Sequence, residues 1–182
     1  MAVCPTWLLA GNRGGSMQKG PIVLGLFLIV SSGTPADIKG LRPHPNRSEY
    51  SVTCFTEDIG VGATLVSPAQ VRHLFGQEID HNYIVVEVGF YSKNRSTFEV
   101  RHADFKLRNR PSRTLAYPAD PREIVSKVSH PLQALIEMTL PQAPTSQALA
   151  GYLLFPVTDA SASFYELDYT GYGAWLTLPL KP

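Results

Sequence analysis

The strongest strand pattern in the chain is the long apolar run of residues 83–91, "YIVVEVGFY". One set of alternate positions is wholly apolar: Ile84, Val86, Val88 and Phe90. The opposite set is mixed and includes Glu87. Because a period of two places each set on one face of a β-strand, we predict a strand whose apolar face lines the core.

Residues 67–76, immediately before this strand, predict a short helix. Ser67 and Gln70 have the spacing of a capping box at its start. Apolar residues then follow at helical spacing, and Gly76 suits the end of the helix. The next six residues, 77–82 ("QEIDHN"), are almost all polar, so we predict an acidic turn there.

Other alternating or apolar runs predict further strands, at residues 50–55, 62–66, 97–108, 148–157, 163–169 and 173–180. The insertion between two of them, residues 109–148, breaks this rhythm. Asp120 and Pro121 predict the start of a helix within it, and a second short helix is expected after Pro131. Six or seven strands with a helical insertion predict a mainly β protein, an antiparallel sandwich. Its core is expected to bury six side chains together: Val86, Val88, Phe90, Leu153, Phe155 and Leu178.

The first 36 residues resemble a secretory signal. Lys19 precedes the apolar run of residues 21–30, and a small-x-small end follows at Ala36. That run is shorter than the roughly 20 residues that span a bilayer, so no stable transmembrane anchor is expected. A signal that is retained as an anchor, without cleavage, remains the alternative. We expect export to the periplasm or the extracellular space, with a mature chain that begins near Asp37.

Two boundaries follow from this pattern. Met17 lies just before the positive residue of the signal, so residues 1–16 are either part of the signal or a leader ahead of the true start codon. Residues 37–47 have two prolines and no periodicity, which predicts a linker or an irregular arm. Residues 48–182 are then expected to form a single sandwich domain.

Charge excludes some partners. The 182-residue chain has 16 basic and 15 acidic residues, a formal charge of +1. Loss of Arg13 and Lys19 with the signal leaves 14 basic residues and a charge of −1. A nearly neutral exported domain has no general attraction for nucleic acid or anionic lipid, so we expect neither as a partner.

Four segments carry a resemblance to a known group: "NYIVVEVGFYSKN", "FEVRHADFKLR", "ALAGYLLFPV" and "FYELDYTGYGAWLTLPL". Their order is similar to that in the immunoglobulin-like domains of bacterial exported proteins. The likeness extends over about two-thirds of the chain, from Tyr83 to Leu180. It implies an immunoglobulin-like sandwich without shared catalytic residues. The short helix before residue 83 and the insertion 109–148 depart from the group's plain pattern, so individual function is expected there.

One local run is basic and contains Arg101, Lys106, Arg108, Arg110 and Arg113. Arginine binds carboxylate or phosphate groups through paired N–H donors, so Arg101, Arg108, Arg110 and Arg113 are candidate ligand-binding residues. The alternative is a solvated strand face. In either case, replacing the last three with serine is expected to leave stability nearly unchanged.

A second, weaker candidate is a metal site at Glu78, Asp80 and His81, although their spacing matches no recognised ligand pattern. The sequence has no Gly-x-Ser-x-Gly nucleophile turn, glycine-rich phosphate loop or Cys-x-x-Cys pair. Cys54 lies in a predicted strand, which favours a core residue over a nucleophile.

The sequence therefore favours an exported, non-enzymatic binding or interaction module, without a cofactor, whose partner is a protein or an anionic envelope ligand. One alternative is a hydrolase or metal-dependent enzyme on a β-sandwich scaffold. The other is a structural component of an envelope assembly.

Overall fold

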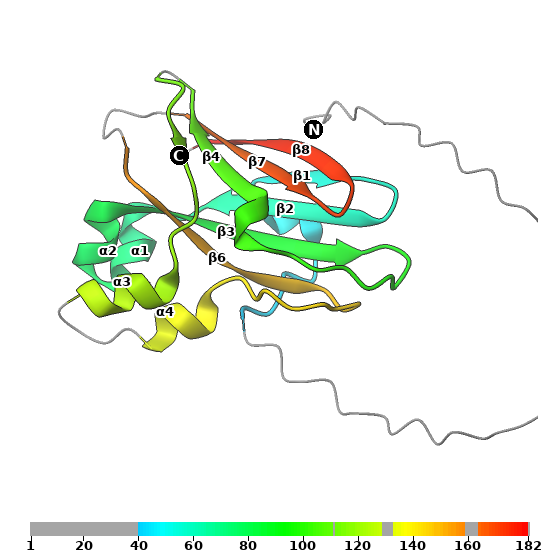
Figure 1. Cartoon of the computed structure of the whole chain (residues 1–182), viewed down its shortest axis with the longest axis horizontal. Coiled ribbons are helices and arrows are strands. Elements are labelled where there is room, and N and C mark those ends of the chain that lie inside the picture. The colour runs from blue at the N-terminus through cyan, green and yellow to red at the C-terminus, as the bar shows by residue number, and fades with distance from the viewer. Residues whose placement is uncertain (1–39, 111, 129–132, 159–163, 182) are drawn as a thin grey trace, which may run out of the picture.

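The structure is a computed structural model that describes residues 40–110, 112–128, 133–158 and 164–181. Within these residues, two four-stranded antiparallel sheets pack face to face (Figure 1). The strand order is β1-β2-β3-β6 in the first sheet and β5-β4-β7-β8 in the second. The prediction of a mainly β, antiparallel sandwich is thus confirmed. The predicted signal, residues 1–36, lies outside the described residues.

The first sheet consists of β1 (Val52–Phe55), β2 (Ile59–Leu65), β3 (Tyr83–Ser92) and β6 (Leu149–Pro156). The second consists of β4 (Phe105–Asn109), β5 (Leu115–Ala116), β7 (Tyr165–Gly171) and β8 (Ala174–Leu180). Helices α1 (Pro68–Phe75) and α2 (Gln77–Asn82) connect β2 to β3, and α3 (Pro121–Lys127) and α4 (Gln133–Met138) connect β5 to β6. Short 3-10 turns are η1 (Arg47–Glu49) and η2 (His102–Asp104).

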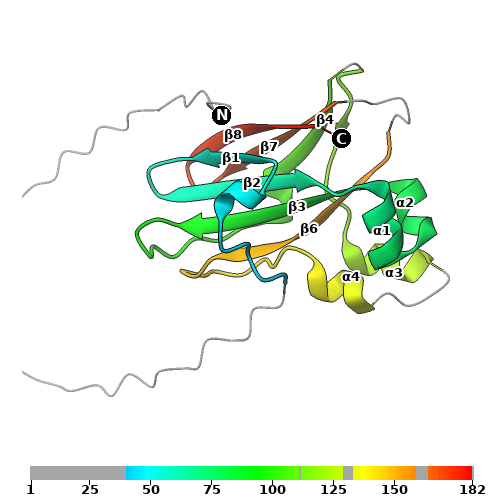
Figure 2. The same cartoon turned by 180° about the vertical axis from the view of Figure 1, so that it is seen from behind.

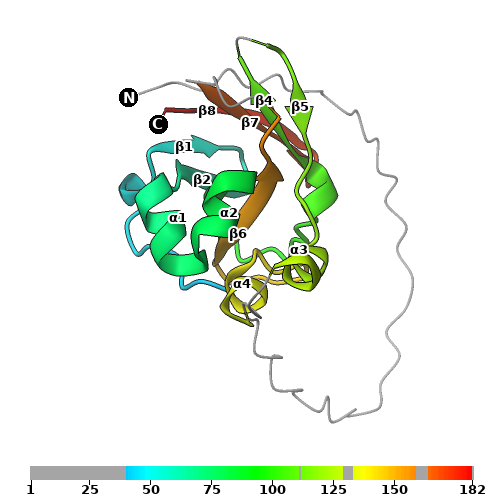
Figure 3. The ribbon, with the colours of Figure 1, turned by 90° about the vertical axis from the view of Figure 1, so that its left-hand side faces the viewer.

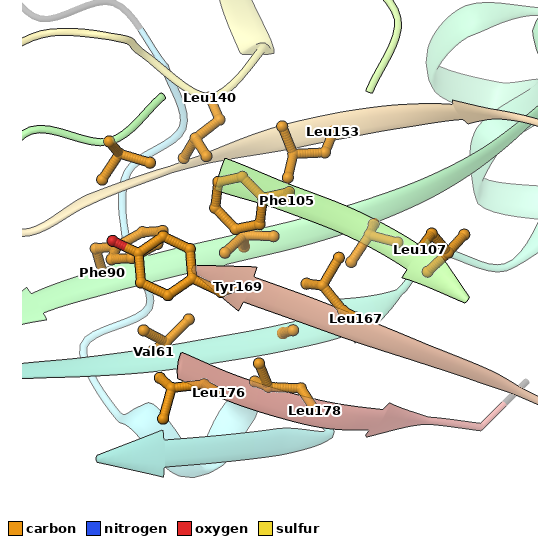
Figure 4. Close-up of a cluster of buried hydrophobic side chains, with 14 of the residues drawn as sticks. Val61, Phe90, Phe105, Leu107, Leu140, Leu153, Leu167, Tyr169, Leu176 and Leu178 are labelled. Carbon is orange, nitrogen blue, oxygen red and sulfur yellow. The ribbon is translucent and has the colours of Figure 1, made fainter. Parts of the chain in front are cut away.

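The core lies between the two sheets. The six side chains expected there are each no more than 1% exposed and belong to one cluster, so this prediction is confirmed. Phe90 of β3 meets two rings from the second sheet, Phe105 and Tyr169, with ring centroids 6.0 and 5.2 Å away (Figure 4). Cys54 is also buried in this cluster.

A second apolar cluster lies on the outer face of the first sheet. Val85, Tyr152 and Leu154 point away from the main core and contact apolar side chains from all four helices: Val71, Phe75, Ile79, Ile124 and Leu135. Figure 3 shows these helices gathered on the side of the first sheet. No helix lies over the outer face of the second sheet among the described residues, and on that face Lys106, Arg108 and Thr177 are half-buried and Trp175 is exposed.

The capping box predicted for α1 is present, because Ser67 and Gln70 exchange side-chain and backbone hydrogen bonds. The predicted turn over residues 77–82 is wrong, since these residues form α2. Gly76, with φ +87°, joins the two helices through a backbone conformation that side chains disfavour. The single apolar residue of α2, Ile79, is fully buried and holds this short helix on the sheet.

The predicted extent of the strand over residues 97–108 is also wrong, because the observed strand, β4, covers only Phe105–Asn109. Phe98 makes only an isolated bridge to Thr145, η2 follows, and β4 begins at Phe105. Within the insertion 109–148, both predicted helices are present as α3 and α4. The insertion also contributes β5 to the second sheet, where Ala116 lies opposite Leu107. A strand of two residues has too short a pattern to be recognised in a sequence.

The outer edge of β6 is covered by three separate segments of the chain. Leu41, Ala119 and Leu140 donate their backbone N–H groups to the carbonyls of residues 150, 154 and 152, respectively. Leu41 belongs to the segment expected as a linker or arm, and the described part of that segment passes across the first sheet from beside β2 to β6 in Figure 2. His44 holds the same segment in place, because its two ring nitrogens lie 2.9 and 3.0 Å from the carboxylates of Glu49 and Glu87.

The half-buried imidazole of His102 gives a prediction about pH. Its Nε2 lies 2.7 Å from the carbonyl of Leu140, and burial lowers the pKa of His102 below its usual 6.5. As the pH falls, the unfolded chain therefore takes up this proton before the folded chain does. The contribution of His102 to stability is complete above pH 6.5 and decreases as the pH falls from 6.5 to the lowered pKa. We expect His102→Gln to flatten this part of the profile, measured by urea unfolding at a series of pH values. An equal effect from His81→Gln, at an exposed position on α2, would contradict the assignment.

Candidate functional site

The two basic residues within β4, Lys106 and Arg108, lie on the same face of the strand. Phe105, Leu107 and Asn109 are buried. The alternate residues Lys106 and Arg108 therefore point outward, opposite Asp168 and Glu166 of β7. Both acids are on the outer face, yet they are only 5 and 8% exposed. The outer face thus presents arginines above nearly buried carboxylates.

Diagonal ion pairs connect the two strands. Arg108 Nη2 lies 2.7 Å from Asp168 Oδ2, and Arg110 Nη2 lies 2.6 Å from Glu166 Oε1. Thr177 of β8 donates a further hydrogen bond to Asp168, at 2.7 Å. The hydrogen bond and charge of Glu166 raise the pKa of Arg110. The two guanidinium groups are therefore held in place by the carboxylates of β7. The side chains of Arg108 and Arg110 nevertheless remain 42% and 63% exposed, respectively.

A pocket of about 530 Å³ opens beside these pairs. It is lined by Arg108, Arg110, Arg113, Leu115 and Glu166. Arg113 is exposed, has a positive φ of 57°, and has no ion-pair partner among the residues that the structure describes. The three arginines carry three positive charges, and the carboxylates of Glu166 and Asp168 neutralise two of them, so the pocket has a net positive charge. The arrangement suits an anionic group, and Leu115 supplies an apolar wall.

The structure brings together three of the four predicted arginines. Arg101 lies apart from the pocket, beyond η2, where its Nη2 is 3.3 Å from Asp104. The ion pairs also change the expectation that serine replacements are neutral. Loss of Arg108 or Arg110 would leave a nearly buried carboxylate without its counter-charge, which is destabilising. Only Arg113 can be changed without that consequence.

The weaker candidate group lies on α2. Asp80 makes an ion pair with Arg72 of α1, at 3.3 Å, and so joins the two helices. Glu78 and His81 are exposed on the same short helix. Across the described ranges, no group of three or more histidine, cysteine, aspartate or glutamate side chains is arranged to hold a metal ion.

Sequence reasoning did not select Glu166, Asp168 or Leu115 as site residues. The alternation in residues 163–169 correctly separates the two acids from the core-facing set of Tyr165, Leu167 and Tyr169, but it does not say which strand pairs with β7. The register between β4 and β7 joins positions about 60 residues apart, and that register is what places the arginines over the acids.

Comparisons with known proteins find little. No protein-family model and no curated protein matches the chain. A solved structure described as a "putative lipoprotein (ycdA)" from Bacillus subtilis is similar at 15% identity and a TM-score of 0.46. The match covers 71% of this chain and 38% of that one, so this chain spans less than half of that protein. At this level the likeness carries no argument about function.

The helices that the structure describes are short. None of them is long and apolar enough to cross a membrane.

Proposed function

We propose that this protein is an exported, immunoglobulin-like, non-enzymatic binding module that holds an anionic group in the pocket of Arg108, Arg110 and Arg113. The observation that carries the proposal is how the side chains of these three arginines are paired. Two are fixed by nearly buried carboxylates, and the third has no ion-pair partner in the described part of the chain. Fixed cationic donors lose little freedom when they bind an anion, so they favour recognition.

The strand order supports the immunoglobulin-like part of the proposal. If β2, β3 and β6 are strands A, B and E, then β5, β4, β7 and β8 take the places of C′, C, F and G. The chain crosses between sheets after β3, β5 and β6, as this order requires. Strand D has no counterpart among the described strands, and β1 is additional.

Export is supported by the sequence of the first 36 residues, with their positive, apolar and small-residue segments. In the periplasm or outside the cell, anionic groups are available on proteins and on envelope polymers. The pocket contains arginine rather than lysine, and arginine binds carboxylate and phosphate groups with paired donors.

Inorganic phosphate is the simplest probe of the pocket. We expect calorimetric titration to show binding that weakens as salt rises, because exposed charges are screened. Arg113→Gln is expected to reduce the affinity about tenfold or more, since a hydrogen bond to a charged group contributes about 1.5–3 kcal/mol.

Arg122→Gln is the matched control, because Arg122 is also exposed but lies on α3, outside the pocket. It is expected to leave phosphate binding unchanged. Equal affinities for the wild type and Arg113→Gln, or an equal loss in both variants, would refute the proposed site. Thermal unfolding of Arg113→Gln should match the wild type, which separates a loss of binding from a loss of fold.

A further inference from the structure

An exposed tryptophan lies on the same face as the arginine pocket but at its other end. Trp175 of β8 is 69% exposed and lies opposite Thr170 of β7. Its neighbour Leu176 is buried, so alternation directs Trp175 outward. Two residues further on, Thr177 shares this face and bonds to Asp168, the partner of Arg108. A large aromatic ring exposed on an uncovered sheet is a feature typical of binding surfaces.

The register sets the distance between the tryptophan and the pocket. Trp175 is level with Thr170, whereas Arg108 is level with Glu166, four residues back along β7. Two strand spacings separate β8 from β4. At about 3.4 Å per residue and 4.8 Å per strand, the diagonal from Trp175 to Arg108 is roughly 17 Å. A ligand that contacts both has to be extended, with a flat face at one end and a negative charge at the other.

Two classes of extended ligand have this form, an acidic peptide and an acidic glycan, and the face itself distinguishes them. A sheet presents side chains on its face and backbone N–H and C=O groups only at its edges, which is where extended peptides usually bind. A peptide lying across the face would have its own backbone groups without partners. Sugar hydroxyl groups, in contrast, can bond to the arginine and threonine side chains present here, and a sugar ring has an apolar face that packs on an aromatic ring.

We propose that the outer face of the second sheet binds an acidic oligosaccharide, with Trp175 stacked on a sugar ring and a sugar carboxylate in the pocket of Arg108, Arg110 and Arg113. This inference rests on the proposed function, because it uses the same anion pocket. It adds the ligand class and a second contact point. Thr177, a half-buried residue of β8, lies between the two on the same face.

Trp175 supplies its own signal. The chain has two tryptophans, Trp7 and Trp175, so the full chain with Trp7→Phe reports on Trp175 alone. Oligogalacturonate is the probe, and its fully methyl-esterified form is the matched neutral ligand. We expect oligogalacturonate to change the fluorescence of Trp175 and to bind more tightly than inorganic phosphate, whereas the ester binds weakly. In calorimetry, Trp175→Ala should reduce affinity for oligogalacturonate about tenfold and leave phosphate binding unchanged.

Three other outcomes would overturn the glycan inference, and they differ in what they imply for the proposed function. If phosphate binds through Arg113 but Trp175→Ala does not affect oligogalacturonate, the glycan inference fails and the proposed function stands. If neither phosphate nor oligogalacturonate binds, both fail. If hexaglutamate binds as tightly as oligogalacturonate, with the same dependence on Trp175, the ligand is an acidic peptide.

Discussion

Val88→Asp is expected to prevent folding. Val88 is fully buried at the middle of β3, between Ala63 of β2 and Gly151 of β6, and belongs to the main core. A carboxylate at this position has neither water nor a cationic partner, and burying it costs several kcal/mol even when it becomes protonated. That cost is comparable to the roughly 5–15 kcal/mol that stabilises a typical domain. Near-ultraviolet circular dichroism and urea unfolding should show no native signal and no cooperative transition.

Leu115→Asp is the matched control, because it makes the same chemical change at a strand position that is 45% exposed. Its new carboxylate would lie beside the arginines that line the pocket, so the protein should fold normally. A soluble Val88→Asp protein with the same unfolding transition as the wild type would show that β3 does not organise the core.

Gly151→Ala should destabilise the protein by about 1–3 kcal/mol or more, the usual cost of forcing an extra group into a packed interior. A Cβ at this position would point at the backbone of Leu140, closer than real Cβ atoms come to any neighbour. Leu140 cannot move aside without losing its hydrogen bond to Tyr152 and its place in the core. Denaturant unfolding measures the change as a lower midpoint.

Gly60→Ala separates this effect from the general cost of replacing a strand glycine. The nearest atoms to a Cβ there belong to the ring of Phe55, which is exposed and can rotate. We expect Gly60→Ala to cost less than Gly151→Ala. Equal losses would mean that the approach of Leu140 to β6 contributes nothing to the effect.

The parts of the fold that the sequence predicted are those whose signal is local. The capping box at Ser67, the apolar run of β3 and the leucines of β8 depend on neighbours a few residues away, and all three are present. Helix α2 was missed because one apolar residue, Ile79, gives no periodicity. Strand β5 was missed because two residues cannot show a pattern.

The candidate site was predicted only in part, for a different reason. The sequence indicated a basic run that includes Arg108, Arg110 and Arg113, but whether it is a solvated face or a pocket depends on what lies beneath it. That is decided by Glu166 and Asp168, which reach the arginines through the pairing of β4 with β7. Strand register between distant segments is a tertiary property, set by the packing of the whole core.

The covered edge of β6 bears on how this protein behaves at high concentration. A sheet with an open edge can recruit another chain as an extra strand, and repeated recruitment leads to fibres. Along β6 the carbonyls of Ala150, Tyr152 and Leu154 already accept hydrogen bonds from the protein's own chain. Growth from the first sheet would therefore begin at β1, a strand of only four residues. A mutation that detaches the segment around Leu41 or Leu140 would open a second starting point, eight residues long.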